Sequence, residues 1–442
     1  MMDYDLEKEE EQEISGKFSL PGIGRGVKLP KFPPFHGKED EEDTDIPDDP
    51  EAEQEESEEK KKPAQKEPVK EEPLAELEPD RITITMLGVS GSGKTMFLSG
   101  VYQSLIQDSC SGISLAGDDS RPSADPSVKV TRQIRDIALT EHYSNGEGWV
   151  FPLGTNRTVE YPLRLLYQEK EVCGFDFLDY AGGQIANLLD LPESGLNADQ
   201  EKLLTQLKKS DALLIFADAD VIARHRVFAS DTEMALCRNE AGADKVNELF
   251  NELKSFYSDR SMTVLIVLTK TDKVPDSMRR SNYAELVERT KEVYRNLWTT
   301  LRQKSEDTDH PWSIGIVPVT AVGRGNEVRH LKTTEMRDGI PIVIEKDVAV
   351  RFPQPENMDA AMVYAVAAIM KQKCQRLVRE EKFLIGQKKN PDPVIRKAAF
   401  DRSNQLETLR RKMENYVIDL TQAKGIISKI LDRHDVLGWW LN

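Results

Sequence analysis

The feature that most constrains this chain is the segment from Gly88 to Thr95, GVSGSGKT, which fits the pattern G-x4-G-K-[ST]. It follows an alternating apolar run, Ile82–Leu87, and precedes a helical stretch, Met96–Gln107. Strand, glycine-rich loop and helix in this order form the context in which the pattern cradles phosphate, whereas an accidental glycine-rich turn lacks that context. The segment therefore predicts a nucleotide-binding α/β domain.

The residue types in this loop suit the binding of phosphate. Glycines let successive backbone N–H groups turn toward the phosphates, and the helix N-terminus adds a partial positive charge. Lys94 is expected to reach the β- and γ-phosphates, and the Thr95 hydroxyl is expected to ligate Mg²⁺. The residues expected to contact the nucleotide here are Gly88, Ser90, Gly91, Ser92, Gly93, Lys94, Thr95 and Met96.

A second motif follows the apolar segment Val172–Leu178 and begins with Asp179-Tyr-Ala-Gly182. An aspartate at the end of a strand can hold Mg²⁺ through a water molecule, and the N–H of Gly182 can sense a γ-phosphate. Asp and Gly are also the commonest residues of ordinary turns, so this motif is weak by itself.

A third motif concerns the base. The run Met262–Leu268 is rich in β-branched residues, as a central parallel strand is, and it leads into Thr269-Lys270-Thr271-Asp272. The Asp272 carboxylate can accept hydrogen bonds from N1–H and the exocyclic amine of guanine, a donor pair that adenine lacks. The Lys270 stem can lie over the base plane. After another predicted strand, the amides of Thr320 and Ala321 can meet the guanine carbonyl.

Together these motifs resemble those of the Ras-like GTPases of the translation-factor (TRAFAC) class. Gly88–Thr95 matches the phosphate loop of that class, Asp179–Gly182 the D-x-x-G element, Thr269–Asp272 the [NT]-K-x-D element and Thr320-Ala321 the weaker S-A-K element. The resemblance covers roughly residues 81–375. The surroundings are also similar to those of the bacterial double-GTPase families of conflict and defence gene clusters.

Two positions depart from the pattern of the Ras-like class. The glutamine that often orients the attacking water is replaced by Gly183, and Gln184 comes one residue later. The lysine of the S-A-K element is replaced by Val322. Hydrolysis by the usual route is therefore in doubt, and recognition of the base rests mainly on Asp272.

The threonine that closes on Mg²⁺ in such switches is expected between residues 154 and 158. Thr155 and Thr158 are both candidates for this metal contact, and both are also compatible with an ordinary strand. Arg157 lies between them and is a candidate for an arginine supplied in cis to the transition state. The candidate catalytic residues are therefore Lys94, Gly182, Gln184 and Arg157.

Strands and helices are expected to alternate along the chain. The expected strands lie near 82–87, 159–167, 172–178, 212–218, 262–268 and 313–319, and the expected helices near 94–107, 185–208, 240–258, 283–304 and 358–379. This order predicts a mostly parallel P-loop sheet flanked by helices, with the strand at 159–167 antiparallel at an edge. The expected domains are a disordered acidic tail (1–80), a GTPase domain (81–380) with an insertion (108–150) and a hairpin (324–356), and a C-terminal helical or coiled-coil segment (381–442).

The negative charge of the chain lies in the tail. Residues 1–80 hold 27 acidic and 11 basic side chains, a net charge of −16 out of a total of −17. Such a segment buries too little apolar surface to fold, so we expect disorder. The remaining residues are nearly neutral and lack the basic face of a nucleic-acid binder. The four cysteines lie far apart, as in a protein of the reducing cytoplasm.

Two segments outside the core are candidate interaction sites. Residues 14–38 contain basic and apolar side chains but no carboxylate, and they suit a docking peptide, a lipid-facing peptide or a plain linker. Near the C-terminus, residues 403–432 carry a stripe with the a/d spacing of a coiled coil. That stripe and the Trp439-Trp440 pair suit self-association or a second protein, and the same stripe also suits a helix folded back on the body.

The expected function is a GTP-binding switch with slow, Mg²⁺-dependent hydrolysis, which signals its nucleotide state to a protein partner. Its cofactors would be GTP or GDP and Mg²⁺, and contact with the partner would use the switch region, the 14–38 peptide or the C-terminal helix. No nucleic-acid partner and no transmembrane segment are expected. The alternative is a hydrolysis-deficient GTP-binding scaffold, which Gly183 favours. A phosphate-loop ATPase is a third option, against which Asp272 argues.

Overall fold

The computed structural model describes residues 81–107, 112–121, 129–132, 141–142, 148–150, 158–180, 188, 195–337 and 340–434. The expectations for the tail 1–80, its 14–38 segment and the Trp439-Trp440 pair lie outside these residues. Chain contacts separate a unit of residues 1–71 from a unit of residues 72–442, and the description below concerns the second unit.

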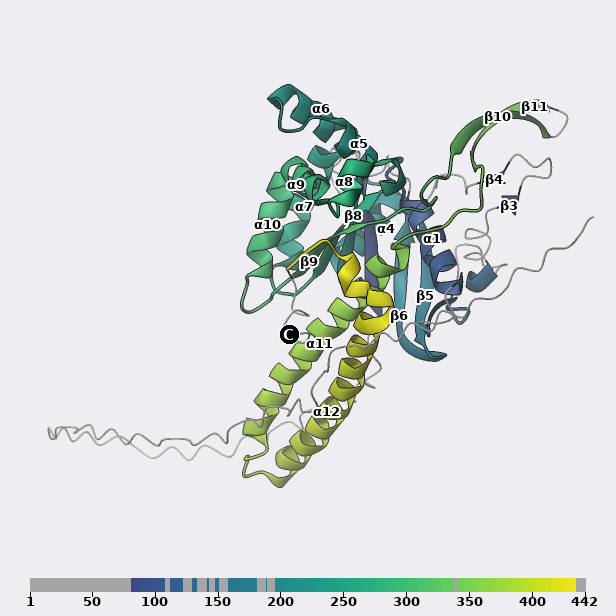
Figure 1. Cartoon of the computed structure of the whole chain (residues 1–442). Coiled ribbons are helices and arrows are strands. Elements are labelled where there is room, and N and C mark those ends of the chain that lie inside the picture. The colour runs from purple at the N-terminus through teal and green to yellow at the C-terminus, as the bar shows by residue number, and fades with distance from the viewer. Residues whose placement is uncertain are drawn as a thin grey trace, which may run out of the picture. The chain divides into compact units, whose positions relative to one another are not determined.

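A sheet of eight strands, in the order β12-β9-β8-β7-β1-β6-β5-β2, forms the centre of this unit (Figure 1). The strands are β1 (Ile82–Leu87), β2 (Ile113–Gly117), β5 (Val159–Tyr167), β6 (Lys170–Asp179), β7 (Ala212–Asp218), β8 (Thr263–Thr269), β9 (Ser313–Pro318) and β12 (Asp432–His434). The five strands from β6 to β9 in this order are parallel, whereas β2, β5 and β12 each pair antiparallel with a neighbour. The expected mostly parallel P-loop class is confirmed.

Helices cover both faces of the sheet. They are α1 (Lys94–Gln107), α4 (Ala198–Lys209), α5 (Ala219–Arg224), α6 (Asp231–Ala241), α7 (Ala243–Leu253), α8 (Asp276–Arg280), α9 (Ala284–Val293), α10 (Arg295–Ser305), α11 (Met358–Gln387) and α12 (Pro393–Gln422). Short 3-10 turns lie at Lys254–Tyr257 (η3), Thr271–Lys273 (η4) and Ala423–Lys429 (η5).

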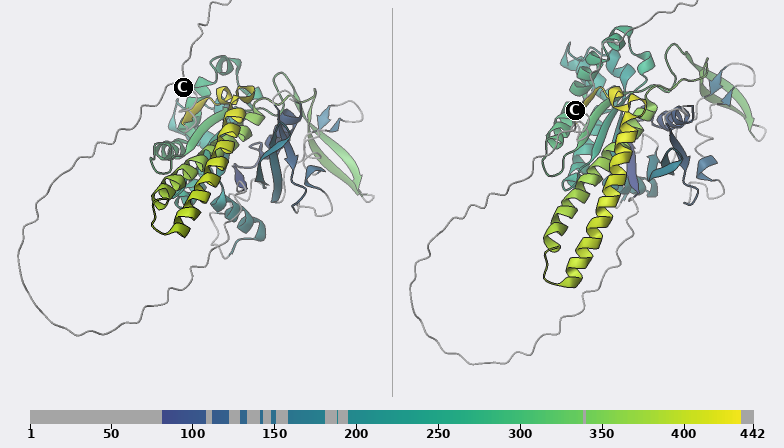
Figure 2. Two further views of the ribbon diagram at one scale, coloured as in Figure 1. Left: turned by 90° about the horizontal axis from the view of Figure 1, so that it is seen from below. Right: turned by 60° about the horizontal axis from the view of Figure 1, so that its bottom comes forward.

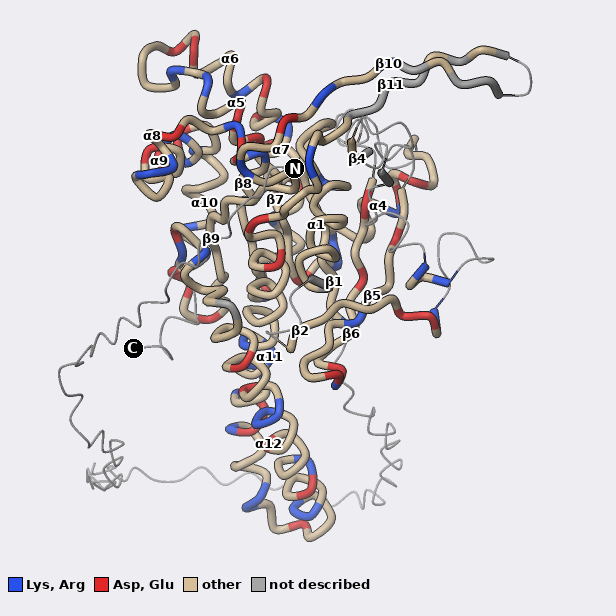
Figure 3. Tube along the Cα trace, turned by 45° about the vertical axis from the view of Figure 1, so that its right-hand side comes forward, with Lys and Arg blue, Asp and Glu red and all other residues tan. Residues whose placement is uncertain are grey.

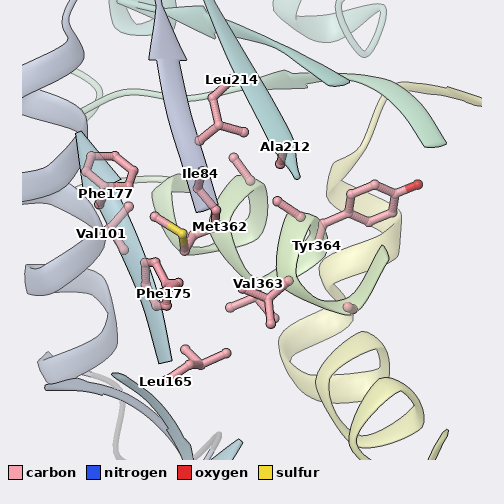
Figure 4. Close-up of a cluster of buried hydrophobic side chains, with 14 of the residues drawn as sticks. Ile84, Val101, Leu165, Phe175, Phe177, Ala212, Leu214, Met362, Val363 and Tyr364 are labelled. Carbon is pink, nitrogen blue, oxygen red and sulfur yellow. The ribbon is translucent and has the colours of Figure 1, made fainter. Parts of the chain in front are cut away.

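The central strands are apolar on both faces because each face has its own core. Along β7, Leu214 and Phe216 pack with α1 and α11, while Leu213 and Ile215 pack into the core on the opposite face, which contains α4, α7 and α10. Figure 4 shows part of the first core, in which Met362 and other α11 side chains lie against strand residues. A continuous apolar run is therefore what a central parallel strand requires.

Some elements differ from the expectation. The strand at 159–167 (β5) is not an edge strand, because β2 from the insertion pairs with it and forms the edge. The helix expected over 240–258 is two helices, α6 and α7, that meet at Gly242. Gly242 has a φ of +65°, and a Cβ there would lie 2.1 Å from Val89 Cγ1 of the phosphate loop, so only glycine fits this corner. The helix expected over 283–304 is likewise divided into α9 and α10.

A second, smaller sheet has the order β10-β11-β4-β3. Its long hairpin consists of β10 (Val328–Arg337) and β11 (Ile340–Ala349), and the short strands β4 (Trp149–Val150) and β3 (Glu141–His142) extend it. Two segments that we expected as separate additions, the insertion and the later hairpin, therefore share one sheet.

The last two long helices, α11 and α12, form an antiparallel hairpin that extends away from the sheet (Figure 2). The expected boundary at 380/381 lies inside α11. The stripe on α12 faces α11, since Leu406, Met413 and Leu420 are each at most 4% exposed. The fold-back arrangement is thus the one the structure has, and the stripe is not free for self-association.

Candidate functional site

The loop between β1 and α1 lies at the carboxyl end of the parallel strands. Gly91 and Gly93 have φ values of +76° and +93°, which side chains rarely allow, and the Ser92 hydroxyl donates to the Val89 carbonyl at 2.8 Å. The first N–H groups of a helix have no partner within the helix, and α1 begins directly at Lys94. The loop and the start of α1 therefore have the geometry of an anion-binding turn.

The ammonium of Lys94 is held inside this loop. Its Nζ donates to the carbonyl oxygens of Gly88 at 2.8 Å and Val89 at 3.1 Å, and it lies 5.0 Å from the centre of the Tyr180 ring. Lys94 is only 6% exposed, and its burial lowers the pKa of its ammonium to about 8, although the nearby Asp179 carboxylate acts in the opposite direction. The site therefore contains a buried cation without a full counter-charge.

This pKa gives a testable dependence on pH. Above about pH 8 the free protein holds Lys94 largely neutral, whereas a bound triphosphate requires the ammonium form, so binding must take up a proton. We expect uptake of roughly a tenth of a proton at about pH 7 and roughly three-quarters at about pH 8.5. Affinity should correspondingly fall as pH rises above 8. Calorimetric titrations in buffers of different ionisation enthalpy measure this number, and equal uptake at both pH values would contradict the assignment.

The Thr95 side chain and Asp179 meet beside this lysine. The Thr95 hydroxyl donates to Asp179 Oδ2 at 3.0 Å, and Asp179 is 1% exposed at the end of β6. A hydroxyl and a carboxylate are oxygen ligands of the kind that Mg²⁺ prefers, so the donor set fits that ion. The described residues hold no cluster of three or more His, Cys, Asp or Glu side chains, so phosphate and water would supply the other ligands.

One of the two candidate switch threonines is described. Thr158 directly precedes β5, whose first residue, Val159, pairs in register with Asp179, so Thr158 lies at the same end of the sheet. It is buried, and its N–H donates to Asp199 Oδ2 at 3.3 Å. Thr155 lies outside the described residues, as do Arg157, Gly182, Gly183 and Gln184.

The segment after β8 is connected to the phosphate loop. Thr269 Oγ1 lies 2.9 Å from the Ser92 carbonyl oxygen and 3.3 Å from that of Ala217. Lys270 has a left-handed backbone, and its Nζ lies 2.5 Å from Asp218 Oδ2. Thr269 therefore fixes the distance between the base-reading segment and the phosphate loop.

Asp272 and Thr320 are directly bonded. The Thr320 hydroxyl donates to Asp272 Oδ1 at 2.6 Å, and it accepts from the N–H groups of Val322 at 3.2 Å and Gly323 at 3.1 Å. The N–H of Thr320 donates to the Glu356 carbonyl. Three amides of this loop thus bind within the protein, and Ala321 is the residue whose amide we propose for the guanine carbonyl.

Two residues of this site were missed by the motif analysis. Tyr180 is fully buried, and its hydroxyl accepts from the Gly88 N–H at 3.2 Å, so it supports the start of the phosphate loop. Asp218 caps α5, as expected, by accepting from two of its N–H groups, and it also pairs with Lys270. The available signal was positional, because Asp218 and Thr269 end neighbouring parallel strands in register.

Comparison with known proteins gives a family match. The model of the family described as Double-GTPase 2 matches residues 82–320, which include the phosphate loop, Asp179, the Thr269–Asp272 segment and Thr320. No curated protein matches the chain.

Solved structures also show similarity. One is the signal recognition particle receptor SRb-GTP/SRX complex from Chaetomium thermophilum, with 17% identity over 55% of this chain and 93% of that chain and a TM-score of 0.29. Another is a mutation variant of SsGBP, with 14% identity over 55% of this chain and 51% of that chain and a TM-score of 0.23.

Proposed function

The chain belongs to the double-GTPase 2 family, and on this premise we propose that it is a GTP-binding switch that hydrolyses GTP slowly with Mg²⁺. Family membership makes residues 82–320 a guanine-nucleotide-binding domain. Slow turnover and the relay of the nucleotide state to a protein partner are the further steps of the proposal.

The observation that carries the proposal is the convergence of the motif residues at one edge of the sheet. The Lys94 ammonium is buried among loop carbonyls, and the Thr95 hydroxyl contacts the Asp179 carboxylate. Thr269 connects this phosphate end to the segment that carries Asp272. One nucleotide can therefore span both ends, with phosphates at Lys94 and the base at Asp272.

Each residue has a separate task in this proposal. The Lys94 ammonium would exchange its two carbonyl acceptors for phosphate oxygens, and Asp179 with Thr95 would hold Mg²⁺, which neutralises charge on the β- and γ-phosphates. Asp272, oriented by Thr320, would accept from guanine. Thr158 would contact the metal end. A partner would read the segment before β5 and the one after β6, because both end beside the γ-phosphate position.

The second candidate is a GTP-binding scaffold without useful turnover. It is favoured by Gly183, which stands where a water-orienting glutamine is usual, with Gln184 one residue later. Under the switch proposal, Gln184, Arg157 or a residue of the partner supplies that missing function.

Titration with fluorescent GTP, GDP and ATP analogues, followed by a single-turnover assay with and without Mg²⁺, tests these options. We expect GTP and GDP to bind at least about a hundredfold more tightly than ATP, because adenine leaves the Asp272 carboxylate unpaired. Intrinsic hydrolysis should be on the order of 10⁻⁴ to 10⁻³ s⁻¹.

The outcomes separate the candidates. Tight GTP binding without measurable phosphate release favours the scaffold, and slow release that stops on chelation of Mg²⁺ favours the switch. ATP binding as tight as GTP binding would contradict both.

A further inference from the structure

The far end of the α11–α12 hairpin, residues 382–400 and here called the hairpin tip, exposes an unusual amount of apolar surface. Five of the twelve large apolar side chains that are exposed among the described residues lie within it. These are Phe383 (69% exposed), Ile385 (51%), Val394 (68%), Ile395 (43%) and Phe400 (55%). Exposed apolar side chains normally occur singly, so such clustering marks an interaction surface.

The hairpin tip is also positively charged. It contains five basic residues, Lys382, Lys388, Lys389, Arg396 and Lys397, and one acidic residue, Asp392. Asp392 is engaged in capping α12, where it accepts from the Val394 N–H at 2.8 Å. Just behind the tip, Glu380 pairs with Arg402 at 3.0 Å and Glu381 with Arg410 at 3.7 Å. These acids are therefore already paired, and Figure 3 shows the charged positions along the hairpin.

The basic side chains suit an apolar surface that meets water. The Lys388 ammonium lies 5.3 Å from the centre of the Phe400 ring and donates to Ser403 Oγ at 2.8 Å. Lysine and arginine stems can lie along apolar groups while their charged ends remain in a polar layer. The tip thus has an apolar end with a rim of positive charge.

The apolar residues surround the end of the hairpin instead of forming one face. Phe383 and Ile385 are two residues apart on α11 and so point about 200° apart around the helix. The residues of α11 that are buried end at Cys374, so its last thirteen residues extend beyond the core (Figure 2). A groove on a protein accepts one face of a helix, whereas a fluid layer accepts an end that is apolar all round.

From these observations we propose that the hairpin tip docks on the surface of an anionic lipid bilayer. The apolar side chains would enter the boundary between headgroups and acyl chains, and the five basic residues would pair with lipid phosphates and carboxylates. None of the helices among the described residues is long and apolar enough to cross a membrane, so this contact is peripheral. Residues 14–38 combine five basic residues with apolar ones and without acids, the same chemistry, and stable attachment generally needs two such signals.

Co-sedimentation of the full-length protein with vesicles tests the proposal. The vesicles contain phosphatidylcholine alone or with a third of phosphatidylserine, and we expect binding only to the second kind. Changing Lys389, Arg396 and Lys397 together to Glu should lower the partition coefficient at least about a hundredfold, since each basic residue near such a surface contributes about fivefold. Changing Phe383, Val394 and Phe400 together to Gln should lower it on the order of a hundredfold.

Matched changes on the body of the domain control for charge and hydropathy. Arg226, Lys245 and Arg280 changed to Glu, and Phe228, Leu236 and Phe256 changed to Gln, alter residues that are equally exposed but lie far along the chain from the hairpin. These variants should bind vesicles like the wild type. Because all the altered side chains are exposed, thermal unfolding should stay unchanged in every variant and exclude misfolding.

Several results would overturn the proposal. One is full-length protein that does not bind anionic vesicles, which would leave the tip for an acidic peptide or a protein partner. Another is loss of binding in the Glu variant with full binding in the Gln variant, which would indicate simple electrostatic adsorption. Equal losses in the body variants would also overturn it. Nucleotide binding is measured separately, so failure of this proposal leaves the proposed function intact.

Discussion

Changing Lys94 to Met should abolish measurable binding of GTP, with a loss on the order of 10³-fold or more. The methionine keeps the length and the apolar stem beside Tyr180 but removes the only buried cation of the loop, which would be the main counter-charge of the γ-phosphate. Fluorescent-nucleotide titration measures the affinity, and thermal unfolding with and without GTP gives an independent measure. Saturating GTP should stabilise the wild type by about 3 kcal/mol at a hundred times Kd and should not stabilise the variant.

The nucleotide-free variant should remain folded. Removing a desolvated ammonium relieves a penalty, while the carbonyls of Gly88 and Val89 lose a donor, so the two effects oppose each other. Lys371→Met is the matched control, since Lys371 is also 6% exposed and burial also lowers the pKa of its ammonium, but it lies on α11. Loss of GTP binding in both variants, or in neither, would show that Lys94 does not contact the phosphates.

Changing Asp272 to Asn should exchange the preference for guanine for one for xanthine. The Thr320 hydroxyl accepts from two backbone N–H groups, so its own hydrogen is directed at Asp272 Oδ1. In the variant that hydrogen selects the amide oxygen for the same place, and the amide nitrogen then faces the base. Guanine would present its donors to another donor, whereas xanthine offers a carbonyl at C2. We expect GTP to bind about 10² to 10⁴ times more weakly and xanthosine triphosphate to bind better than GTP.

The orientation of the amide by Thr320 has its own check. In Asp272→Asn combined with Thr320→Val, the amide is no longer oriented, so the preference for xanthine should decrease. Asp231→Asn, an exposed carboxylate in the first turn of α6, is the control for the change of charge. Unchanged affinity for GTP in Asp272→Asn would remove Asp272 from the base site.

The nucleotide site depends largely on patterns that are local in the sequence. The phosphate loop, its strand and its helix lie within residues 82–107, and the segment after β8 begins directly at the end of an apolar run. Local dihedral preferences and hydrogen-bonding groups decide such loops, because glycine at positive φ and a helix N-terminus need no distant partner. The parallel order of the central strands follows from the alternation of strand and helix.

The supporting contacts depend on residues that are far apart in the chain. Asp218 meets Lys270 across 52 positions, Thr320 meets Asp272 across 48, and Tyr180 meets Gly88 across 92. No periodicity reports such pairs, because each depends on the register between neighbouring strands. The edge strand β2 was missed for the same reason, since its pairing with β5 is decided by the surface that β5 leaves open.

The sequence by itself determined that this chain binds nucleotide phosphates in an α/β sheet and which segment reads the base. It also determined that α12 carries an apolar stripe, but the spacing of a stripe is the same whether a second chain or the same chain covers it. The tertiary structure decided for α11, because a five-residue connection brings the two helices side by side and buries Leu406, Met413 and Leu420 between them. It also decided that the apolar residues at the turn remain exposed, since neither helix has a partner beyond its own end.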